Sequence, residues 1–265
     1  MKKQGKHILA GILVLLAVLL WLMFCGYQWS WGPFSSVHDL KTSRLPGNAD
    51  PYNVTHTQQL ENSPLEGKTI VFLGSSVTYG AAAKGVSFAD YIGARNRCNI
   101  VKEAVNGTTL VDEGFSSYIS RMKKLDVPNA DLFVCQLSTN DATQKKPLGT
   151  VSGSGQIGDF DTSTVAGAIE SIVAYAKETW GCPVVFYTNP RYESEAYGEM
   201  VELLLELSEK WDITVVDMWN DDAFNDITKE QRELYMADAI HPTQAGYLEW
   251  WTPEIEKALY QAEES

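Results

Sequence analysis

Short apolar runs alternate with segments of helical periodicity from residue 68 to the C-terminus. The apolar runs are rich in β-branched residues and predict five strands, at residues 69–73, 99–104, 131–137, 183–187 and 213–217. Apolar residues repeat at helical spacing in five further segments, at residues 87–95, 115–125, 164–179, 195–211 and 244–262. Strands that are apolar throughout and separated by helices indicate a parallel sheet with helices on both faces. We therefore predict an α/β domain over residues 67–265.

The N-terminus has a different pattern, because residues 8–25 form an uninterrupted run of 18 uncharged, mostly aliphatic residues. As a helix this run spans roughly 27 Å, which is enough to cross the hydrocarbon core of a bilayer. Three lysines precede the run and the next Lys or Arg is Lys41, so the positive-inside rule leaves the N-terminus in the cytoplasm. We therefore predict that residues 1–31 form a cytoplasmic tip and a single-pass anchor in the cell membrane, with the rest of the chain extracytoplasmic.

A cleaved signal peptide is the alternative to an anchor, and the protein would then be secreted. Small residues usually precede a cleavage site, whereas Met23, Phe24 and Tyr27 are bulky. Cys25 does not fit a lipoprotein cysteine either, because Phe24 stands where a small residue is wanted. An uncleaved anchor is the favoured interpretation.

Residues 32–66 separate the apolar run from the α/β pattern. They are rich in Pro, Gly, Ser, Asn and Thr and show little periodicity. This composition predicts an extracytoplasmic stalk or a loosely packed lead-in.

Charge and cysteine content narrow the classes of function. Removing the three N-terminal lysines from the net charge of −13 leaves −16 for residues 27–265, and such an acidic body repels phosphate backbones. Nucleic acid is therefore not an expected partner. No metal-type spacing occurs among the cysteines and histidines, which are Cys25, Cys98, Cys135, Cys182, His7, His38, His56 and His241. The sequence leaves open both a disulfide among the three later cysteines and the oligomeric state.

Two short segments carry the candidate chemistry. The first predicted strand is followed by Gly-Ser-Ser-Val-Thr-Tyr-Gly at residues 74–80. This pattern is typical of a strand that ends in a tight turn and presents a hydroxyl group there. Residues 238–242 read Asp-Ala-Ile-His-Pro, and His241 is the only histidine after the lead-in. A hydroxyl, an imidazole and a carboxylate are the groups that acyl transfer through a serine intermediate needs.

With these segments the sequence resembles the SGNH (GDSL-type) hydrolase superfamily over roughly residues 68–262. Its four blocks are matched by residues 74–80, by Gly107, by residues 138–141 and by residues 238–242. Ser75 replaces the acid of the first block and Ser138 replaces the glycine of the third. The resemblance implies a flavodoxin-like three-layer α/β/α sandwich with about five parallel strands. The α/β-hydrolase signature Gly-x-Ser-x-Gly is not met, because Thr78 stands where its last glycine would be.

The resemblance also implies roles for individual residues. Ser76 is the expected nucleophile, His241 the base and Asp238 the acid that orients the imidazole, with Asp217 in reserve for the acid. The expected oxyanion donors are the backbone N–H groups of Ser76 and Gly107 and the side-chain amide of Asn140. This chemistry requires no metal or organic cofactor.

Two loops are expected at the rim of the site. Arg191 and Tyr192 follow the fourth predicted strand and are candidates for substrate contact. The glycine-rich residues 149–159 form either a mobile lip over the site or an exposed loop without such a role.

Together these features predict a membrane-anchored extracytoplasmic serine esterase that hydrolyses O-acetyl or short acyl esters of small molecules or glycans. One alternative is an O-acyltransferase that acts on cell-surface glycans with the same three side chains. The other is a catalytically silent surface-binding module, which the presence of Ser76, Asp238 and His241 disfavours.

Overall fold

The computed structural model describes residues 2–29, 32–34 and 36–264. Its centre is a parallel sheet of five strands in the order β2-β1-β3-β4-β5. The strands are β1 (Thr69–Gly74), β2 (Asn99–Ala104), β3 (Leu132–Gln136), β4 (Val184–Tyr187) and β5 (Thr214–Val216). All five predicted strands are confirmed, and the strand order is that of a flavodoxin-like doubly wound sheet.

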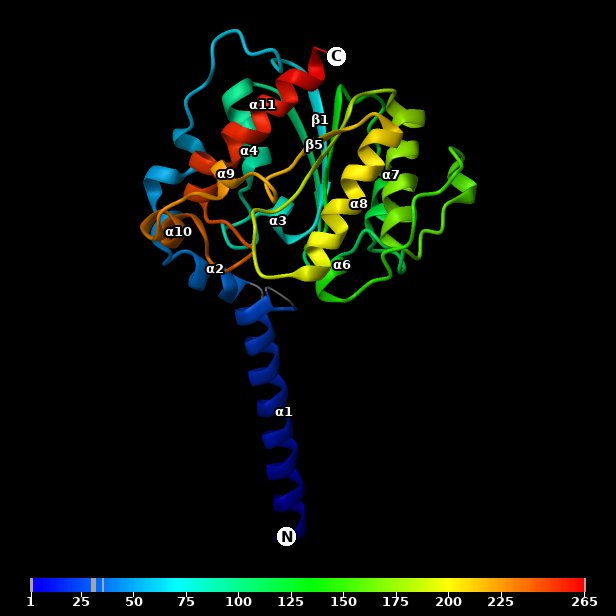
Figure 1. Ribbon diagram of the computed structural model, residues 1–265. Coiled ribbons are helices and arrows are strands. Elements are labelled where there is room, and N and C mark those ends of the chain that lie inside the picture. Colours follow the sequence, from blue (N-terminus) through cyan, green and yellow to red (C-terminus); the bar gives the residue numbers. More distant parts are fainter. Residues whose placement is uncertain (1, 30–31, 35, 265) are drawn as a thin grey trace.

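Helices cover both faces of the sheet, as Figure 1 shows. One face packs against α4 (Phe88–Asn96) and α11 (Thr252–Glu263), and the other against α5 (Tyr118–Met122), α7 (Val165–Trp180) and α8 (Glu195–Trp211). Side chains of β1 alternate between the two resulting cores, with Phe72 in the first and Val71 in the second. The three-layer α/β/α prediction is therefore confirmed.

Two predicted helices differ from the observed ones. The helix expected over residues 115–125 is reduced to α5, which Ser117 caps by accepting a hydrogen bond from the Ser120 N–H at 3.1 Å. The helix expected over residues 244–262 begins as a π-helical turn, Gly246–Trp251, before α11. Pro253 lies in the first turn of α11 and has no N–H to donate to the preceding turn, which explains the change there.

The remaining helices are short and sit in the connections. The α-helices are α2 (Ser36–Thr42), α3 (Ser76–Tyr79), α6 (Thr139–Thr143), α9 (Asp222–Asn225) and α10 (Lys229–Tyr235). Single 3₁₀ turns occupy Pro46–Asn48, Asp50–Tyr52, Val54–His56 and Ile157–Asp159.

The apolar N-terminal run forms α1 (Lys2–Trp29), which projects from the domain (Figure 1). Within it, Leu9–Tyr27 has a mean hydropathy of 2.7 and is long enough to cross a bilayer. The length and composition of this helix fit a membrane anchor and fit a signal sequence equally.

The lead-in is packed more closely than its composition predicts. The buried Asn48 donates its side-chain amide to the Thr42 carbonyl at 2.8 Å and to the Ala82 carbonyl at 2.7 Å. Its side-chain oxygen accepts the Gln244 backbone N–H at 2.8 Å. One buried amide thus ties the lead-in to two loops of the domain, which a Pro- and Gly-rich composition does not reveal.

All four cysteines lie in the described residues and are free thiols. Burial raises the pKa of Cys98 and of Cys182 to about 11, so both are protonated and unreactive at neutral pH. Cys135 is fully buried in β3, as its apolar surroundings in the sequence indicate.

Candidate active site

The turn after β1 presents Ser76 at the carboxyl edge of the sheet. β1 ends at Gly74, where a Cβ would lie 1.7 Å from the Thr78 Oγ1, so only glycine allows the chain to turn so tightly. Ser76 then opens α3, which ends at Gly80 with φ of +86°. The Ser76 side chain is largely buried, with 9% of the residue exposed.

The structure brings Ser76, His241 and Asp238 into one chain of hydrogen bonds. The Oγ of Ser76 lies 2.9 Å from the Nε2 of His241. The Nδ1 of His241 lies 2.9 Å from Oδ2 and 3.0 Å from Oδ1 of Asp238. With the imidazole neutral and its proton on Nδ1, Nδ1–H donates to the carboxylate and Nε2 accepts from the hydroxyl, which is the arrangement a general base needs.

Local backbone contacts hold Asp238 against His241. The Oδ1 of Asp238 accepts the backbone N–H groups of Ile240 and His241, each at 2.8 Å. Partial burial alone would raise the pKa of this carboxyl, but the hydrogen bond and charge of His241 and the two N–H groups outweigh it and lower the pKa to about 2. Asp238 is therefore ionised at neutral pH. The reserve acid, Asp217, instead accepts from Asn220 at 2.8 and 3.1 Å.

Gly107 and Asn140 lie in two loops that meet at the same edge. Gly107 follows β2 with φ of +76°, in the left-handed region that favours glycine. Asn140 lies in the first turn of α6, after β3, and its side-chain amide donates to the Thr108 carbonyl at 3.0 Å. Ser138 caps α6 by accepting the backbone N–H groups of Asn140 and Asp141. The serine that replaces the expected glycine thus fixes the start of this helix.

Asp141 fastens the loop after Gly107 to α6. Its buried carboxylate accepts the backbone N–H of Leu110 at 2.8 Å and that of Val111 at 3.1 Å. Burial raises the pKa of this carboxyl above its ordinary value, although those hydrogen bonds oppose the shift. The loop that carries Gly107 and the helix that carries Asn140 are therefore joined directly by one carboxylate.

Gln136, at the end of β3, supports the turn that carries Ser76. The sequence analysis did not identify this residue. Its Oε1 accepts the Ser75 backbone N–H at 2.9 Å and the Thr78 hydroxyl at 2.9 Å. The hydroxyl of Thr78 in turn lies 2.6 Å from that of Tyr187. Ser75, which stands where the family has an acid, is buried in this network. A polar residue at the end of an apolar strand was the one signal that the sequence offered.

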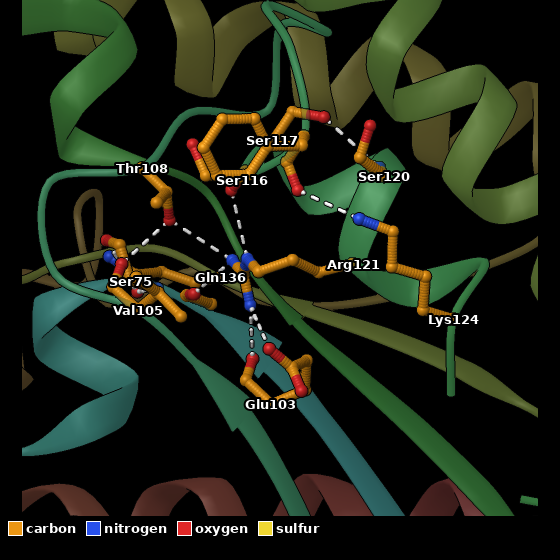
Figure 2. Close-up of polar contacts among 12 residues, drawn as sticks. Ser75, Glu103, Val105, Thr108, Ser116, Ser117, Ser120, Arg121, Lys124 and Gln136 are labelled. Atoms are coloured by element: carbon orange, nitrogen blue, oxygen red, sulfur yellow. Dashed lines mark hydrogen bonds and ion pairs between the residues drawn. The ribbon is translucent and has the colours of Figure 1, made fainter. Parts of the chain in front are cut away.

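Arg121 is the second supporting residue that the sequence missed (Figure 2). Its guanidinium is buried, with 7% of the residue exposed, and donates to the Gly74 carbonyl at 2.8 Å and to the Thr108 hydroxyl at 3.1 Å. It also donates to the backbone and the carboxylate of Glu103 at 3.0 and 2.9 Å. One side chain therefore joins the end of β1, the end of β2 and the loop that carries Gly107.

Asn189 supports the histidine loop from the end of β4. Its side-chain amide donates to the Ile240 carbonyl at 3.0 Å. Its own backbone N–H donates to the buried Tyr197 hydroxyl at 2.9 Å, which donates to the Leu137 carbonyl at 3.0 Å. The carboxyl ends of β3 and β4 are thus connected to the segment that presents His241.

The two predicted rim residues have partners within the protein. Arg191 pairs with Asp222 at 2.9 Å. It lines an open depression of about 500 Å³ together with Asp222, Ala223, Asn225 and Asp226. The Tyr192 hydroxyl is buried, and its ring packs on Tyr197 and Trp219 at centroid distances of 5.2 and 5.3 Å. This placement favours packing over substrate contact for Tyr192.

The glycine-rich loop does not lie over Ser76. Figure 1 shows the 3₁₀ turn Ile157–Asp159 beyond α7, on the side away from α3. Glu170 of α7 accepts the Ser152 N–H at 3.0 Å, and Lys210 of α8 donates to the Ser152 carbonyl at 2.7 Å. The lip hypothesis is therefore not supported, because these buried and paired charges hold the loop on the flank of the domain.

A doubly wound parallel sheet with a linked hydroxyl, imidazole and carboxylate at its carboxyl edge is an arrangement that serine hydrolases use. Residues 72–248 match the GDSL-like lipase/acylhydrolase family, and the chain belongs to that family. Membership supports an esterase- or lipase-type hydrolase. No curated protein matches the sequence.

Solved structures share the fold at low sequence identity. A protein from Lactobacillus plantarum is 19% identical, with a TM-score of 0.60 over 74% of this chain and 96% of its own. A candidate GDSL-like lipase from Bacteroides ovatus is 18% identical, with a TM-score of 0.57 over 74% and 99%. The acetyl xylan esterase AlAXEase is 15% identical, with a TM-score of 0.52 over 72% and 99%.

Proposed function

We propose that the protein is a serine esterase that hydrolyses carboxylic esters through Ser76, His241 and Asp238. The observation that supports this most directly is the unbroken chain of hydrogen bonds from the Ser76 hydroxyl through His241 to Asp238, with distances of 2.9 Å at both links. A serine hydroxyl is a weak nucleophile until a base takes its proton, and this chain supplies the base and its orienting acid.

In the first half-reaction the Oγ of Ser76 attacks the ester carbonyl carbon while the Nε2 of His241 takes the Oγ proton. The ester C–O bond then breaks, and the alcohol leaves with the proton that His241 returns. In the second half-reaction a water molecule gives a proton to His241 and attacks the acyl group. The carboxylic acid leaves as Ser76 regains its proton. Asp238 stabilises the imidazolium in both halves.

The negative charge that develops on the carbonyl oxygen needs preorganised donors. We assign this role to the backbone N–H groups of Ser76 and Gly107 and to the Asn140 amide. Asn140 uses one of its two N–H bonds on the Thr108 carbonyl, which orients the amide and leaves the second for the substrate.

Short acyl esters of small molecules or glycans are the proposed substrates, in an extracytoplasmic setting with α1 as the membrane anchor. Two observations support this. An acetyl xylan esterase shares the fold, and α1 is long and apolar enough to span a bilayer. By the positive-inside rule, the three lysines before the apolar run support a domain outside the cytoplasm.

The experiment is a panel of esters that vary in acyl length and alcohol, given to the full chain in detergent micelles. Ser76→Ala is expected to lower the rate by at least about 10³-fold. Ser163→Ala, which changes an exposed serine in the loop before α7, is the matched control and should leave it unchanged. Release of the free acid identifies hydrolysis, whereas transfer to an added glycan would identify an acyltransferase. Cleavage of none of the esters would contradict the proposal.

A further inference from the structure

The first segment of the lead-in docks beside the candidate active site. Asn48 bonds to the Ala82 carbonyl just after α3, and to the Gln244 N–H three residues after His241. Gly47 packs so closely there that a Cβ would lie 2.2 Å from the Thr243 Oγ1. The chain therefore reaches the domain at the edge that presents Ser76 and His241.

From that point the lead-in runs along the outside of the domain to the opposite edge. The Tyr52 carbonyl accepts the Tyr91 hydroxyl of α4 at 2.6 Å, and the Gly67 N–H donates to the Arg97 carbonyl beyond the end of α4 at 3.1 Å. Only then does β1 begin, at Thr69. Figure 1 shows this path from α2 upward, with α1 leaving the domain on the side of α3 and α6. Direct entry into β1 would instead have attached α1 to the edge remote from Ser76.

The tether between α1 and the docked lead-in is short. α1 ends at Trp29 and α2 ends at Thr42, with α2 taking up the last seven residues. Even with the residues before α2 fully extended, this interval spans at most about 35 Å. The end of α1 also folds against the lead-in, because Cys25 is 2% exposed and Lys41 lies 5.0 Å from the ring centre of Tyr27.

Elements at the same edge carry exposed apolar side chains. Outside α1, the described residues expose four large hydrophobic side chains, namely Leu40, Tyr79, Val105 and Phe115. They belong to α2, to α3 and to the loop that leaves the carboxyl end of β2. Phe115 is 83% exposed, and aromatic rings favour the bilayer interface. The acidic domain is not attracted to anionic lipid. The tether to α1 is therefore what keeps the domain at a high effective concentration near the bilayer surface.

We propose that this edge lies against the outer surface of the bilayer that holds α1, and that the enzyme takes esters presented at that surface in preference to esters in solution. The inference rests on the proposed function for the ester chemistry and for the anchor. The orientation itself can be measured without any activity.

The first experiment measures orientation with the full chain reconstituted in phosphatidylcholine vesicles. A fluorophore is placed on Phe115→Cys and, as the matched control, on Asn129→Cys, an exposed site in the loop before β3 at the remote edge. The native thiols interfere little with labelling. Cys25, Cys135 and Cys182 are buried, and the pKa of the partly buried Cys98 is raised to about 11. Lipids with a quencher near the head group should quench the label at 115 and not the label at 129. Equal quenching at both, or none at 115, would overturn the proposal.

The second experiment compares two acetyl esters on the same vesicles, p-nitrophenyl acetate in solution and a fluorogenic acetyl ester carried by a lipid in the bilayer. Phe115→Ser should lower hydrolysis of the lipid-borne ester several-fold and leave the soluble ester unchanged, whereas Phe115→Leu should behave like the native chain. Equal effects of Phe115→Ser on both esters, or on neither, would overturn the inference. Hydrolysis of neither ester by the native chain would instead contradict the proposed function, and the quenching result would still report the orientation.

Discussion

At the scale of single residues, the ionisation of Asp238 is the most clearly defined property of the site. Its pKa of about 2 in the folded protein lies below the ordinary value of 3.8. A carboxyl with a lowered pKa stabilises the fold above its ordinary pKa, and that contribution is lost as pH falls through the folded value. Asp238 therefore stabilises the native state at neutral pH and loses this effect between about pH 4 and pH 2.

Asp238→Asn tests both roles of this carboxylate. The amide cannot hold the imidazole in the same tautomer or stabilise its charged form, so kcat on p-nitrophenyl acetate should fall by about 10³- to 10⁴-fold. In denaturant titrations the native chain should lose more stability than Asp238→Asn between pH 4 and pH 2. Parallel losses in the two proteins would show that the carboxylate is not paired as described.

Arg121 is a positioning residue. It does not contact Ser76, but it donates a hydrogen bond to the carbonyl of Gly74, two residues before the nucleophile. Arg121→Lys keeps the charge but loses the planar fork that bonds Gly74, Thr108 and Glu103 together. We expect kcat on p-nitrophenyl acetate to fall at least about ten-fold, with a much smaller change in KM.

Arg95→Lys is the matched control, since Arg95 pairs with the buried Glu256 between α4 and α11 at 3.0 Å. It should lower the melting temperature and leave kcat near the native value. Equal losses of kcat in the two variants would reduce the role of Arg121 to general stability.

At the scale of elements, two glycines with similar backbone angles should respond differently to substitution. Gly80 ends α3 with φ of +86°, and a Cβ there would lie 2.2 Å from the Val86 carbonyl oxygen. Gly107 has φ of +76° with no atom within 4 Å of a Cβ. Gly80→Ala therefore adds a backbone clash to the conformational strain, whereas Gly107→Ala adds strain alone, about 1–2 kcal/mol.

Thermal unfolding and kcat measured on both variants separate these effects. Gly80→Ala should lose the greater part of its stability, while Gly107→Ala should stay folded and lose kcat because its N–H shifts. If Gly107→Ala kept full kcat, its assigned place among the oxyanion donors would be wrong.

The elements themselves could be predicted well where burial dictates the sequence. The three central strands were found because central parallel strands must be apolar on both faces, as Val71 and Phe72 are. The helix ends were less well predicted, since Ser117 and Pro253 act through local capping and a missing N–H within patterns that remain amphipathic.

The candidate site was predicted only in part. Ser76, Asp238 and His241 stood in recognisable short segments, and the structure brings them together. Gln136 and Arg121 did not stand out, because their partners come from other strands and loops. A polar residue whose hydrogen bonds are tertiary contacts looks in the sequence like one that faces water.

At the scale of the whole molecule, the path of the chain matters more than its composition. Residues 42–68 travel from the edge beside His241 to the edge where β1 begins, and this route decides which face of the domain lies nearest to α1. A lead-in rich in Pro and Gly gave no sign of that route, since Asn48 and Gln244 are far apart in the sequence.

Retention of α1 is the prediction that belongs to this scale. If α1 is an anchor, the full-length chain should stay in the membrane fraction after carbonate extraction, with an intact mass that includes residues 1–26. A soluble product that begins after residue 26 would identify α1 as a signal peptide, and the orientation proposed above would then fail.

The most direct test of the central claim is the identity of the residue that a fluorophosphonate modifies. The account predicts one adduct, on the Oγ of Ser76, located by peptide mass spectrometry and abolished by denaturing the protein or by His241→Ala. The neighbouring Ser75 is fully buried and bonded to Gln136, so it should remain unmodified. An adduct on Ser75 or on any other residue, or no adduct on the folded native chain, would contradict it.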